Sequence, residues 1–210
     1  MSEIAHIAAT IFRHARHDKR ILIAIAGAPG SGKSTLAEEL AAAMNSSGQS
    51  AIVVPMDGFH YDDTVLARRG LSQSKGAPET FDFAGFECLL KRLTSETGEI
   101  AIPVFDRSME LARAAANIIS DDHKIVLVEG NYLLLDEAPW SRLRPLFDFT
   151  IFLEVPREEL ERRLLERWRD HGRPDGPAWV ASNDMPNVDR VMRKRLASDL
   201  VVRSEARKKE

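Results

Sequence analysis

The sequence lacks the features of a secreted protein, a cysteine-ligated metal protein or a membrane protein. Its single cysteine, Cys88, cannot form an internal disulfide and has no partner for a cysteine metal cluster. No apolar run reaches the length of a transmembrane helix, and the N-terminus has no apolar segment typical of a signal peptide. We therefore expect a cytoplasmic protein in a reducing compartment, with no membrane partner.

An excess of charge of one sign is also missing. The formal net charge is −3 over 210 residues, and acidic and basic residues are interspersed along the chain. This balance argues against a nucleic-acid partner. Internal repeats and low-complexity tracts are absent as well. The remaining composition, 44% hydrophobic and 29% charged, is ordinary for a globular enzyme, and the length suits one α/β domain with a sizeable core.

The strongest positive feature is the stretch Gly27-Ala28-Pro29-Gly30-Ser31-Gly32-Lys33-Ser34, followed by Thr35, which fits the phosphate-binding pattern G-x-x-x-x-G-K-[ST]. An apolar segment over residues 21–26 precedes it, as in a strand buried on both faces, and apolar residues with helical spacing follow it. Glycines let backbone N–H groups close around phosphate oxygens at a helix N-terminus. We expect residues 27–35 to bind the nucleotide, with Lys33 on the terminal phosphates and Ser34 on Mg²⁺.

The other apolar segments predict a mainly parallel sheet with helices on both faces and the strand before the P-loop at its centre. Pro103 limits residues 100–105 to an edge strand. Cys88 falls in a helix with a core-facing stripe, where we expect it to pack inside. Further strands are expected over residues 51–55, 125–128, 147–155 and 200–202, and helices over residues 2–17, 84–96, 156 to about 167, and 185–198.

Two acidic residues leave these strands at the carboxyl edge, where open α/β sheets carry their chemistry. Asp57 is placed to accept the proton of an attacking hydroxyl; its alternative role is to cap the turn before Gly58. Glu129 ends an apolar strand, where a carboxylate is costly to bury unless it pairs with Mg²⁺ or its water. A structural ion pair is the alternative for Glu129.

A basic run, Arg167-Trp168-Arg169-Asp170-His171-Gly172-Arg173-Pro174, follows the charged helix and is broken by glycine and proline. This pattern predicts a lid over about residues 167–182, in which Arg169 and Arg173, together with Arg167, close on the transferred phosphate. An ordinary solvated helix face is the alternative. His60 and Arg107 are candidates for substrate contact within a substrate-side segment over about residues 58–117.

Several segments resemble a known group of P-loop kinases: the phosphoribulokinases, uridine kinases and bacterial pantothenate kinases. They are Val54-Pro55-Met56-Asp57-Gly58-Phe59-His60, Arg69-Gly70, Lys75-Gly76-Ala77-Pro78-Glu79-Thr80-Phe81-Asp82 and Glu129-Gly130-Asn131-Tyr132. The resemblance spans about residues 20–202 and is greatest to small bacterial proteins described as fructose transport system kinases or nucleoside/nucleotide kinase-like proteins.

The resemblance implies a P-loop NTPase three-layer sandwich, Asp57 as catalytic base and an arginine lid after the long charged helix. Arg69 and Lys75 lie in the matching segments and are expected to bind the acceptor. The segment 183–187 resembles one near the adenine end of the nucleotide site.

Together these features predict a single P-loop kinase domain over residues 1–210 that uses ATP and Mg²⁺ to phosphorylate a hydroxyl of a small metabolite. Sugar, nucleoside and pantothenate-like acceptors stay open, as does the oligomeric state, a homodimer included. The alternatives are a regulatory NTPase or nucleotide-sensing protein without a small-molecule acceptor, and a nucleotide-binding scaffold with a dead site. No Asn-Lys-x-Asp element for reading guanine is present, and the polar loop 62–82 favours a pocket for a second substrate.

Overall fold

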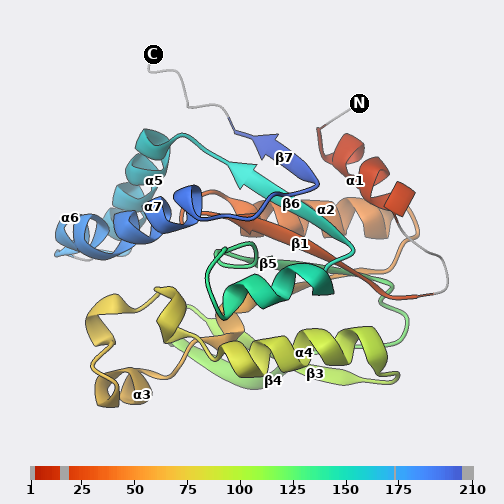
Figure 1. Cartoon of the computed structure of the whole chain (residues 1–210), viewed down its shortest axis with the longest axis horizontal. Coiled ribbons are helices and arrows are strands. Elements are labelled where there is room, and N and C mark those ends of the chain that lie inside the picture. Colours follow the sequence, from red (N-terminus) through yellow and green to blue (C-terminus); the bar gives the residue numbers. More distant parts are fainter. Residues whose placement is uncertain (1–2, 15–18, 173, 205–210) are drawn as a thin grey trace.

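A five-stranded parallel sheet carries the fold, and β1 lies at its centre as predicted (Figure 1). The computed structural model describes residues 3–14, 19–172 and 174–204. Every residue of β1 and β5 is buried, because both faces of the sheet are covered, and this explains their unbroken apolar sequences. In the spatial order β2-β5-β1-β6-β7, the strands are Ala51–Pro55, Ile125–Gly130, Ile21–Gly27, Phe149–Glu154 and Leu200–Arg203.

The register of the central strands decides which residues meet at the carboxyl edge. Glu129 of β5 lies level with Ile25 of β1 on one side and with Pro55 of β2 on the other. Residues that follow these three positions therefore leave the sheet together. The P-loop, Asp57 and Glu129 share one edge for this reason.

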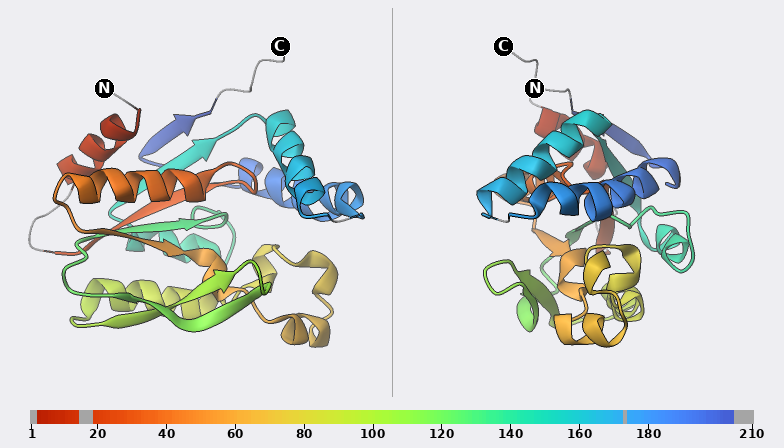
Figure 2. Two further views of the ribbon diagram at one scale, coloured as in Figure 1. Left: turned by 180° about the vertical axis from the view of Figure 1, so that it is seen from behind. Right: turned by 90° about the vertical axis from the view of Figure 1, so that its left-hand side faces the viewer.

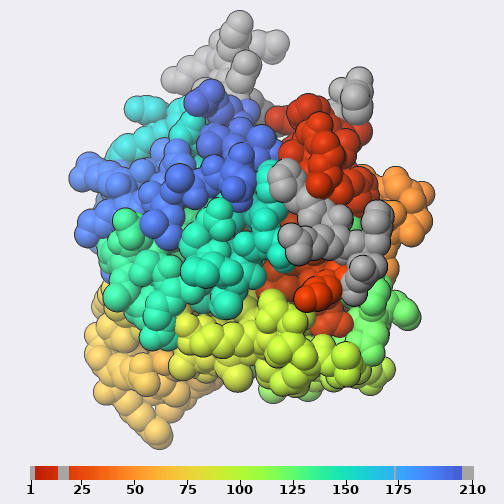
Figure 3. Space-filling view, turned by 45° about the vertical axis from the view of Figure 1, so that its right-hand side comes forward, coloured from red at the N-terminus to blue at the C-terminus, as the bar shows by residue number. Residues whose placement is uncertain are grey.

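Helices lie on both faces of the sheet, as predicted. Helix α2 (Lys33–Ser46) packs against β1, β2 and β5 on the face that is behind the sheet in Figure 1 and in front of it in the left view of Figure 2. Helix α1 (Glu3–His14) contacts α2 and buries Ile7 and Ile11. Helix α4 (Phe83–Ser95) and the 3-10 helix η4 (Trp140–Leu146) contact each other and form a continuous surface in Figure 3.

Short elements surround the carboxyl edge. Above it in Figure 1 lie α5, α6, the π-helix η5 and α7, and below it lie α3 and three 3-10 turns. None of the described helices is long and apolar enough to cross a membrane. The upper group spans Arg157–Asp170, Gly176–Trp179, Val180–Asp184 and Met185–Arg193; α3 is Asp63–Arg68, and η1, η2 and η3 are Met56–Phe59, Ser72–Ser74 and Pro78–Thr80.

A separate antiparallel hairpin, β3 (Ile100–Asp106) with β4 (Leu111–Ile119), extends the molecule beside η1. The register shifts between Ile102 and Val104, at Pro103, because proline cannot donate a ladder hydrogen bond. Residues 100–105 are thus a strand outside the main sheet rather than an edge strand of it. The sequence did not predict β4, because its Ala-rich, largely exposed residues lack the alternation of a half-buried strand.

Two smaller expectations differ from the structure, and a third can be compared only in part. Helix α7 ends at Arg193 rather than at residue 198, where the chain turns toward β7. Cys88 is exposed, because the buried side chains of α4, Phe86, Leu89, Leu90 and Leu93, lie on the other side of the helix. The N-terminal helix predicted over residues 2–17 is observed over Glu3–His14, and residues 15–17 lie outside the described residues.

Candidate active site

The P-loop turns sharply between β1 and α2. Gly30 and Gly32 adopt positive φ angles of 79° and 92°, a region that L side chains disfavour, and Gly32 is the N-cap of α2. Lys33 is the first residue of that helix, so the backbone N–H groups of its first turn have no acceptor inside the helix. This geometry suits a bound anion, as the motif predicts.

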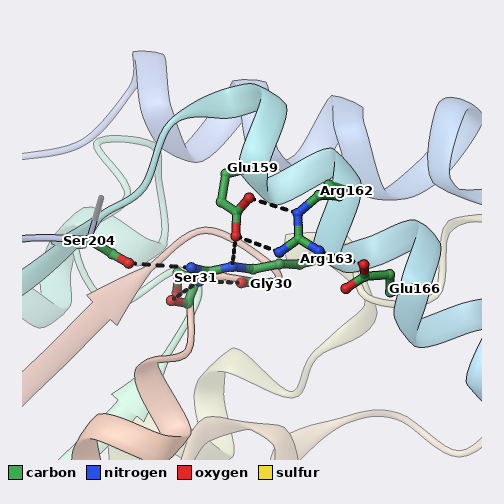
Figure 4. A network of polar contacts seen from close by, with 7 residues as sticks. All are labelled: Gly30, Ser31, Glu159, Arg162, Arg163, Glu166 and Ser204. Carbon is green, nitrogen blue, oxygen red and sulfur yellow. Dashed lines mark hydrogen bonds and ion pairs between the residues drawn. The ribbon is translucent and has the colours of Figure 1, made fainter. Parts of the chain in front are cut away.

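Arg163 of α5 is hydrogen-bonded to the backbone of the P-loop (Figure 4). Its Nη1 donates to the carbonyl oxygens of Ser31 at 3.1 Å and Gly30 at 3.5 Å, and its Nη2 donates to Ser204 Oγ at 3.3 Å. Arg163 Nε in turn donates to Glu159 Oε1 at 2.8 Å. The loop is therefore tied to the helix that precedes the predicted lid and to the end of β7.

Glu159 is the centre of this network. Its side chain is 4% exposed and accepts hydrogen bonds from both Arg162 and Arg163. Hydrogen bonds from Arg162 and then Arg163 lower the pKa of the Glu159 carboxyl to about 2, against the opposing effect of burial. The sequence predicted only a charged helix here, and it did not indicate the contact of Arg163 with the P-loop.

Lys33, Ser34 and Glu129 meet at the start of α2. Ser34 Oγ donates to Glu129 Oε2 at 3.0 Å, and Lys33 Nζ lies 4.0 Å from the same oxygen. Burial raises the pKa of the Glu129 carboxyl, and Lys33 only partly opposes that rise. A buried carboxylate with so little compensation fits a cation ligand, and one hydroxyl with one carboxylate is a donor set suited to Mg²⁺.

Among the residues that the structure describes, no group of three or more His, Cys, Asp or Glu side chains is placed to hold a metal by itself. This agrees with the donor set above, because Mg²⁺ commonly takes only one or two protein carboxylates and completes its shell with phosphate oxygens and water.

Asp57 lies in η1, directly after β2, with its side chain 22% exposed. Arg107, from the turn of the β3–β4 hairpin, donates from Nη2 to Asp57 Oδ2 at 2.6 Å. The neighbouring Gly58 permits this approach, because a Cβ there would stand 2.5 Å from the carbonyl oxygen of Pro103. Gly58 thus lets the hairpin pack against η1.

Positive charge surrounds Asp57. Burial alone would raise the pKa of its carboxyl, but Lys33, Arg107 and Arg167 outweigh that effect, and the net shift is downward. Arg167 lines the same cleft, and its guanidinium makes no hydrogen bond or ion pair with another described residue. Burial first, and then repulsion from Arg107, lower the pKa of Arg167. Asp57 is therefore ionised, and Arg167 has unused donors for an anionic group.

His60 lies beside Asp57 between two aromatic rings. It stacks on Phe81 at a centroid distance of 3.9 Å and meets Phe105 at 5.3 Å. Burial, aided by Lys75 and Arg107, lowers the pKa of His60 to about 4. Its Nδ1 is buried and has no hydrogen-bond partner in the described structure. The ring is neutral at pH 7.

One cleft joins these groups. It measures about 1210 Å³ and is lined by P-loop residues, Asp57, His60, Lys75, Arg107 and Arg167, as well as by residues of η2 and η5. The volume suffices for a nucleotide with a second small molecule, as for other concave ligand sites. The structure thus brings most of the sequence-predicted site residues into a single space.

Among the residues predicted to act in catalysis or to bind the acceptor, three are not placed in the lining of this cleft. Arg169 points to another part of the surface, where its side chain is 73% exposed and pairs with Asp170; one helical turn does not carry both Arg167 and Arg169 to the same side. Arg69 stacks on Tyr61 at 4.2 Å, away from the cleft lining. Arg173 lies outside the described residues.

The segment 183–187 borders the cleft and joins two of its walls. Asn183 Nδ2 donates to the carbonyl oxygen of Lys75 at 2.9 Å, and Trp168 Nε1 donates to Asp184 Oδ2 at 2.6 Å. The segment therefore holds the loop that carries Lys75, and its residues Asp184 and Asn187 line the cleft. Its placement near the adenine end of the nucleotide site stays a prediction.

Residues 22–174 match the model of the phosphoribulokinase/uridine kinase family. The chain belongs to this family. It is 34% identical over 189 residues to the "uncharacterized protein YggC" of Escherichia coli (strain K12), with 88% of this chain and 78% of that protein covered. It is also 34% identical over 200 residues to a "putative uridine kinase" of Schizosaccharomyces pombe (strain 972 / ATCC 24843), with 89% and 84% covered.

A crystal structure from Silicibacter sp. TM1040, described as a "putative fructose transport system kinase", superposes with a TM-score of 0.91 at 42% identity. The superposition covers 96% of this chain and 100% of the Silicibacter chain. The predicted resemblance and the P-loop kinase fold are therefore confirmed. As a member of the phosphoribulokinase/uridine kinase family, the chain is a small-molecule kinase, a phosphotransferase with an alcohol group as acceptor.

Proposed function

We propose that the chain transfers the γ-phosphoryl group of ATP, with Mg²⁺, to a hydroxyl of a small metabolite, and that Asp57 is its general base. The observation that carries the proposal is the position of Asp57 in the cleft, in the field of Lys33 and Arg107. Arg107 occupies Oδ2, whereas Oδ1 accepts no hydrogen bond from a described residue. A substrate hydroxyl has a free carboxylate oxygen to meet there.

The residues divide the reaction between them. Lys33 and the first-turn N–H groups of α2 bind the terminal phosphates, and Ser34 with Glu129 would hold Mg²⁺, which supplies positive charge toward the transferred group. The hydroxyl oxygen forms its bond to the γ-phosphorus as the bond to the β,γ-bridging oxygen breaks. Asp57 orients this hydroxyl and takes its proton.

The low pKa of Asp57 is consistent with that role. In a loose phosphoryl-transfer transition state the nucleophile carries little negative charge until late, so orientation matters more than base strength. Arg107 keeps the Asp57 carboxylate in place, and Arg167 is the lid arginine proposed to meet the transferred phosphoryl group. Arg173 stays a second candidate for that contact.

The alternative is a regulatory NTPase without a small-molecule acceptor. ADP release measured with and without a panel of sugars, polyols, nucleosides and hydroxy acids separates the two. We expect release that depends on an acceptor. ATP hydrolysis that no acceptor stimulates would favour the regulatory NTPase.

Asp57→Asn tests the base directly. The amide keeps the shape but cannot take the proton, so we expect kcat to fall about 10²- to 10⁴-fold while the Kd for ATP stays nearly unchanged. Asp122→Asn, at an exposed turn, is the matched control. A stability loss at Asp57→Asn without a specific catalytic defect would instead support the turn-capping role.

A further inference from the structure

The end of the cleft beyond Asp57 is built from three short segments that are distant in sequence. Asp63 begins α3, Ser72 and Gln73 belong to η2, and Glu110 lies in the turn of the β3–β4 hairpin; all four line the cleft. Lys75 lies among them. We call Asp63, Ser72, Gln73, Lys75 and Glu110 the acceptor-end cluster, and their chemistry restricts which acceptors the site accepts.

Lys75 is already neutralised by carboxylates of this cluster. Its Nζ lies 2.7 Å from Asp63 Oδ1 and 3.7 Å from Glu110 Oε2, and it donates to the carbonyl oxygen of Glu110 at 3.3 Å. The Lys75 side chain is only 22% exposed, and Asn183 holds the backbone of Lys75. Its position is therefore fixed, and Asp63 and the Glu110 carbonyl oxygen take two of its three N–H donors.

The next cation along the cleft is paired as well. Arg107 donates to Asp57 at 2.6 Å. Both cations of the acceptor-end region, Lys75 and Arg107, thus have carboxylate partners. The three carboxylates are Asp63 and Glu110 beside Lys75, and Asp57 beside Arg107. Arg167, the guanidinium of this cleft without a described partner, is the one assigned above to the transferred phosphoryl group. With Arg167 so engaged, an anionic group on the acceptor would have to displace one of the carboxylate partners of Lys75 or Arg107 and would face the others as like charges.

Glu110 occupies its position at an energetic cost. Its φ of 53° lies in the left-handed region, which non-glycine residues rarely adopt. A glycine would fill such a turn without strain, yet this turn places a carboxylate over the cleft beside Lys75.

The hydrogen-bonding groups of the acceptor-end cluster restrict the functional groups that a ligand can place there. Ionised Asp63 and Glu110 accept hydrogen bonds and cannot donate them, so a group that meets them must donate. Hydroxyl groups donate and accept, whereas carboxylates and phosphates only accept. Ser72 and Gln73 add uncharged partners, and the ring of Phe105, which also lines the cleft, offers an apolar face.

We propose that the acceptor is a neutral, polyhydroxylated compound and that Asp63 and Glu110 bind its hydroxyl groups while they exclude acceptors carrying a carboxylate or a phosphate. This inference rests on the proposed kinase function and selects among its acceptor classes.

The test compares acceptors that share a carbon skeleton. Hexoses and hexitols are assayed against the corresponding hexonates and hexose phosphates, and nucleosides against nucleoside 3′-phosphates, so that the sugar and nucleoside sources of the same chemistry are distinguished. We expect kcat/KM for the best neutral compound to exceed that of its anionic counterpart at least about tenfold.

Two variants assign the preference to the cluster. The double variant Asp63→Asn/Glu110→Gln frees Lys75, so it should lower kcat/KM for the neutral acceptor, raise it for the carboxylate, and reduce the preference at least about tenfold. Glu110→Gly removes the second carboxylate at a φ that glycine favours, so it should fold and shift the preference in the same direction. Glu39→Gln, on the exposed face of α2, is the control and should change neither value.

Turnover that favours an anionic acceptor would overturn the inference and leave the kinase function intact. An unchanged preference in both Glu110 variants would overturn it as well. Absence of acceptor-dependent ADP release with every compound would instead contradict the proposed function on which the inference rests.

Discussion

The nucleotide end and the acceptor end of the cleft are built in different ways. At the nucleotide end, Lys33, Ser34 and Glu129 leave buried strands or begin a long helix, and α5 braces the loop through Glu159 and Arg163. At the acceptor end, the side chains come from short helical turns and a two-stranded hairpin. The two carboxylates that pair with Lys75 are largely exposed, Asp63 to 68% and Glu110 to 60%.

This difference matches the tasks of the two ends. A P-loop binds the same phosphates in every kinase that carries it, so a rigid, buried frame is an advantage. Acceptor recognition varies within a fold, and it is assigned to surface loops and turns that tolerate change. Substitutions at the nucleotide end should therefore affect turnover with any acceptor and also stability, whereas those at the acceptor end should change selectivity.

Lys33→Ala should have the largest effect. It removes the point charge from the β- and γ-phosphates, and we expect kcat/KM for ATP to fall on the order of 10³-fold, about 4 kcal/mol of transition-state stabilisation. The loss should be the same for every acceptor. Lys91→Ala, which removes an exposed lysine paired with Glu87 on α4, is the control and should keep full activity. Wild-type turnover by Lys33→Ala would remove the basis for the P-loop assignment.

Arg167→Ala and Arg169→Ala form a matched pair on the border between the two ends. Arg167 lines the cleft with unused donors, so its loss should lower kcat about 10²-fold with little change in acceptor KM. Arg169 is exposed and pairs with Asp170, so its loss should change kcat less than about twofold. Equal effects of the two substitutions in steady-state assays would mean that α5 rotates on substrate binding and that this placement does not persist.

The residues of the nucleotide end could be predicted from the sequence to a greater extent than the contacts of the acceptor end. The P-loop, Asp57 and Glu129 follow from one local rule, apolar strands ending in polar residues, because the parallel register carries them to the same edge. The Arg163 brace and the Lys75 cluster depend on contacts between segments more than 30 residues apart, for example Arg163 with Ser31 and Lys75 with Glu110. Local spacing does not encode such contacts, and for the same reason it did not separate Arg167 from Arg169.

Glu159→Gln should destabilise the nucleotide end in a pH-dependent way. The Glu159 pKa of about 2 lies below its unfolded value of 4.5, so the carboxylate stabilises the fold above pH 4.5, and this stabilisation is lost as the pH falls toward 2. We expect the variant to unfold about 2 kcal/mol more easily at pH 7, from weakened charged hydrogen bonds, and to match the wild type near pH 2.

The control for this prediction lies on the same helix. Glu161 pairs with Arg157 at 3.6 Å on an exposed face, so Glu161→Gln should cost only about 0.5 kcal/mol in chemical denaturation. Loss of the Glu159 carboxylate should also weaken ATP binding, because Arg163 then holds Gly30 and Ser31 less firmly. Normal ATP affinity in Glu159→Gln would show that the brace is not needed by the loop.

Glu129→Gln should change the stability less than Glu159→Gln does, and in the opposite direction. The raised pKa of Glu129 means that its protonated form is favoured in the fold, so its contribution to stability is complete below pH 4.5 and is lost as the pH rises through the folded value. With EDTA present, the variant should therefore be more stable than the wild type at pH 8, by about 1 kcal/mol, and equal to it near pH 4. Addition of Mg²⁺ with an ATP analogue should stabilise the wild type more than the variant in thermal unfolding.

A variant that is less stable at pH 8 in EDTA would mean that the contact of Glu129 with Lys33 outweighs the cost of burial. In that case Glu129 is a structural ion-pair partner rather than a metal ligand, and the nucleotide end is held together by its own charges.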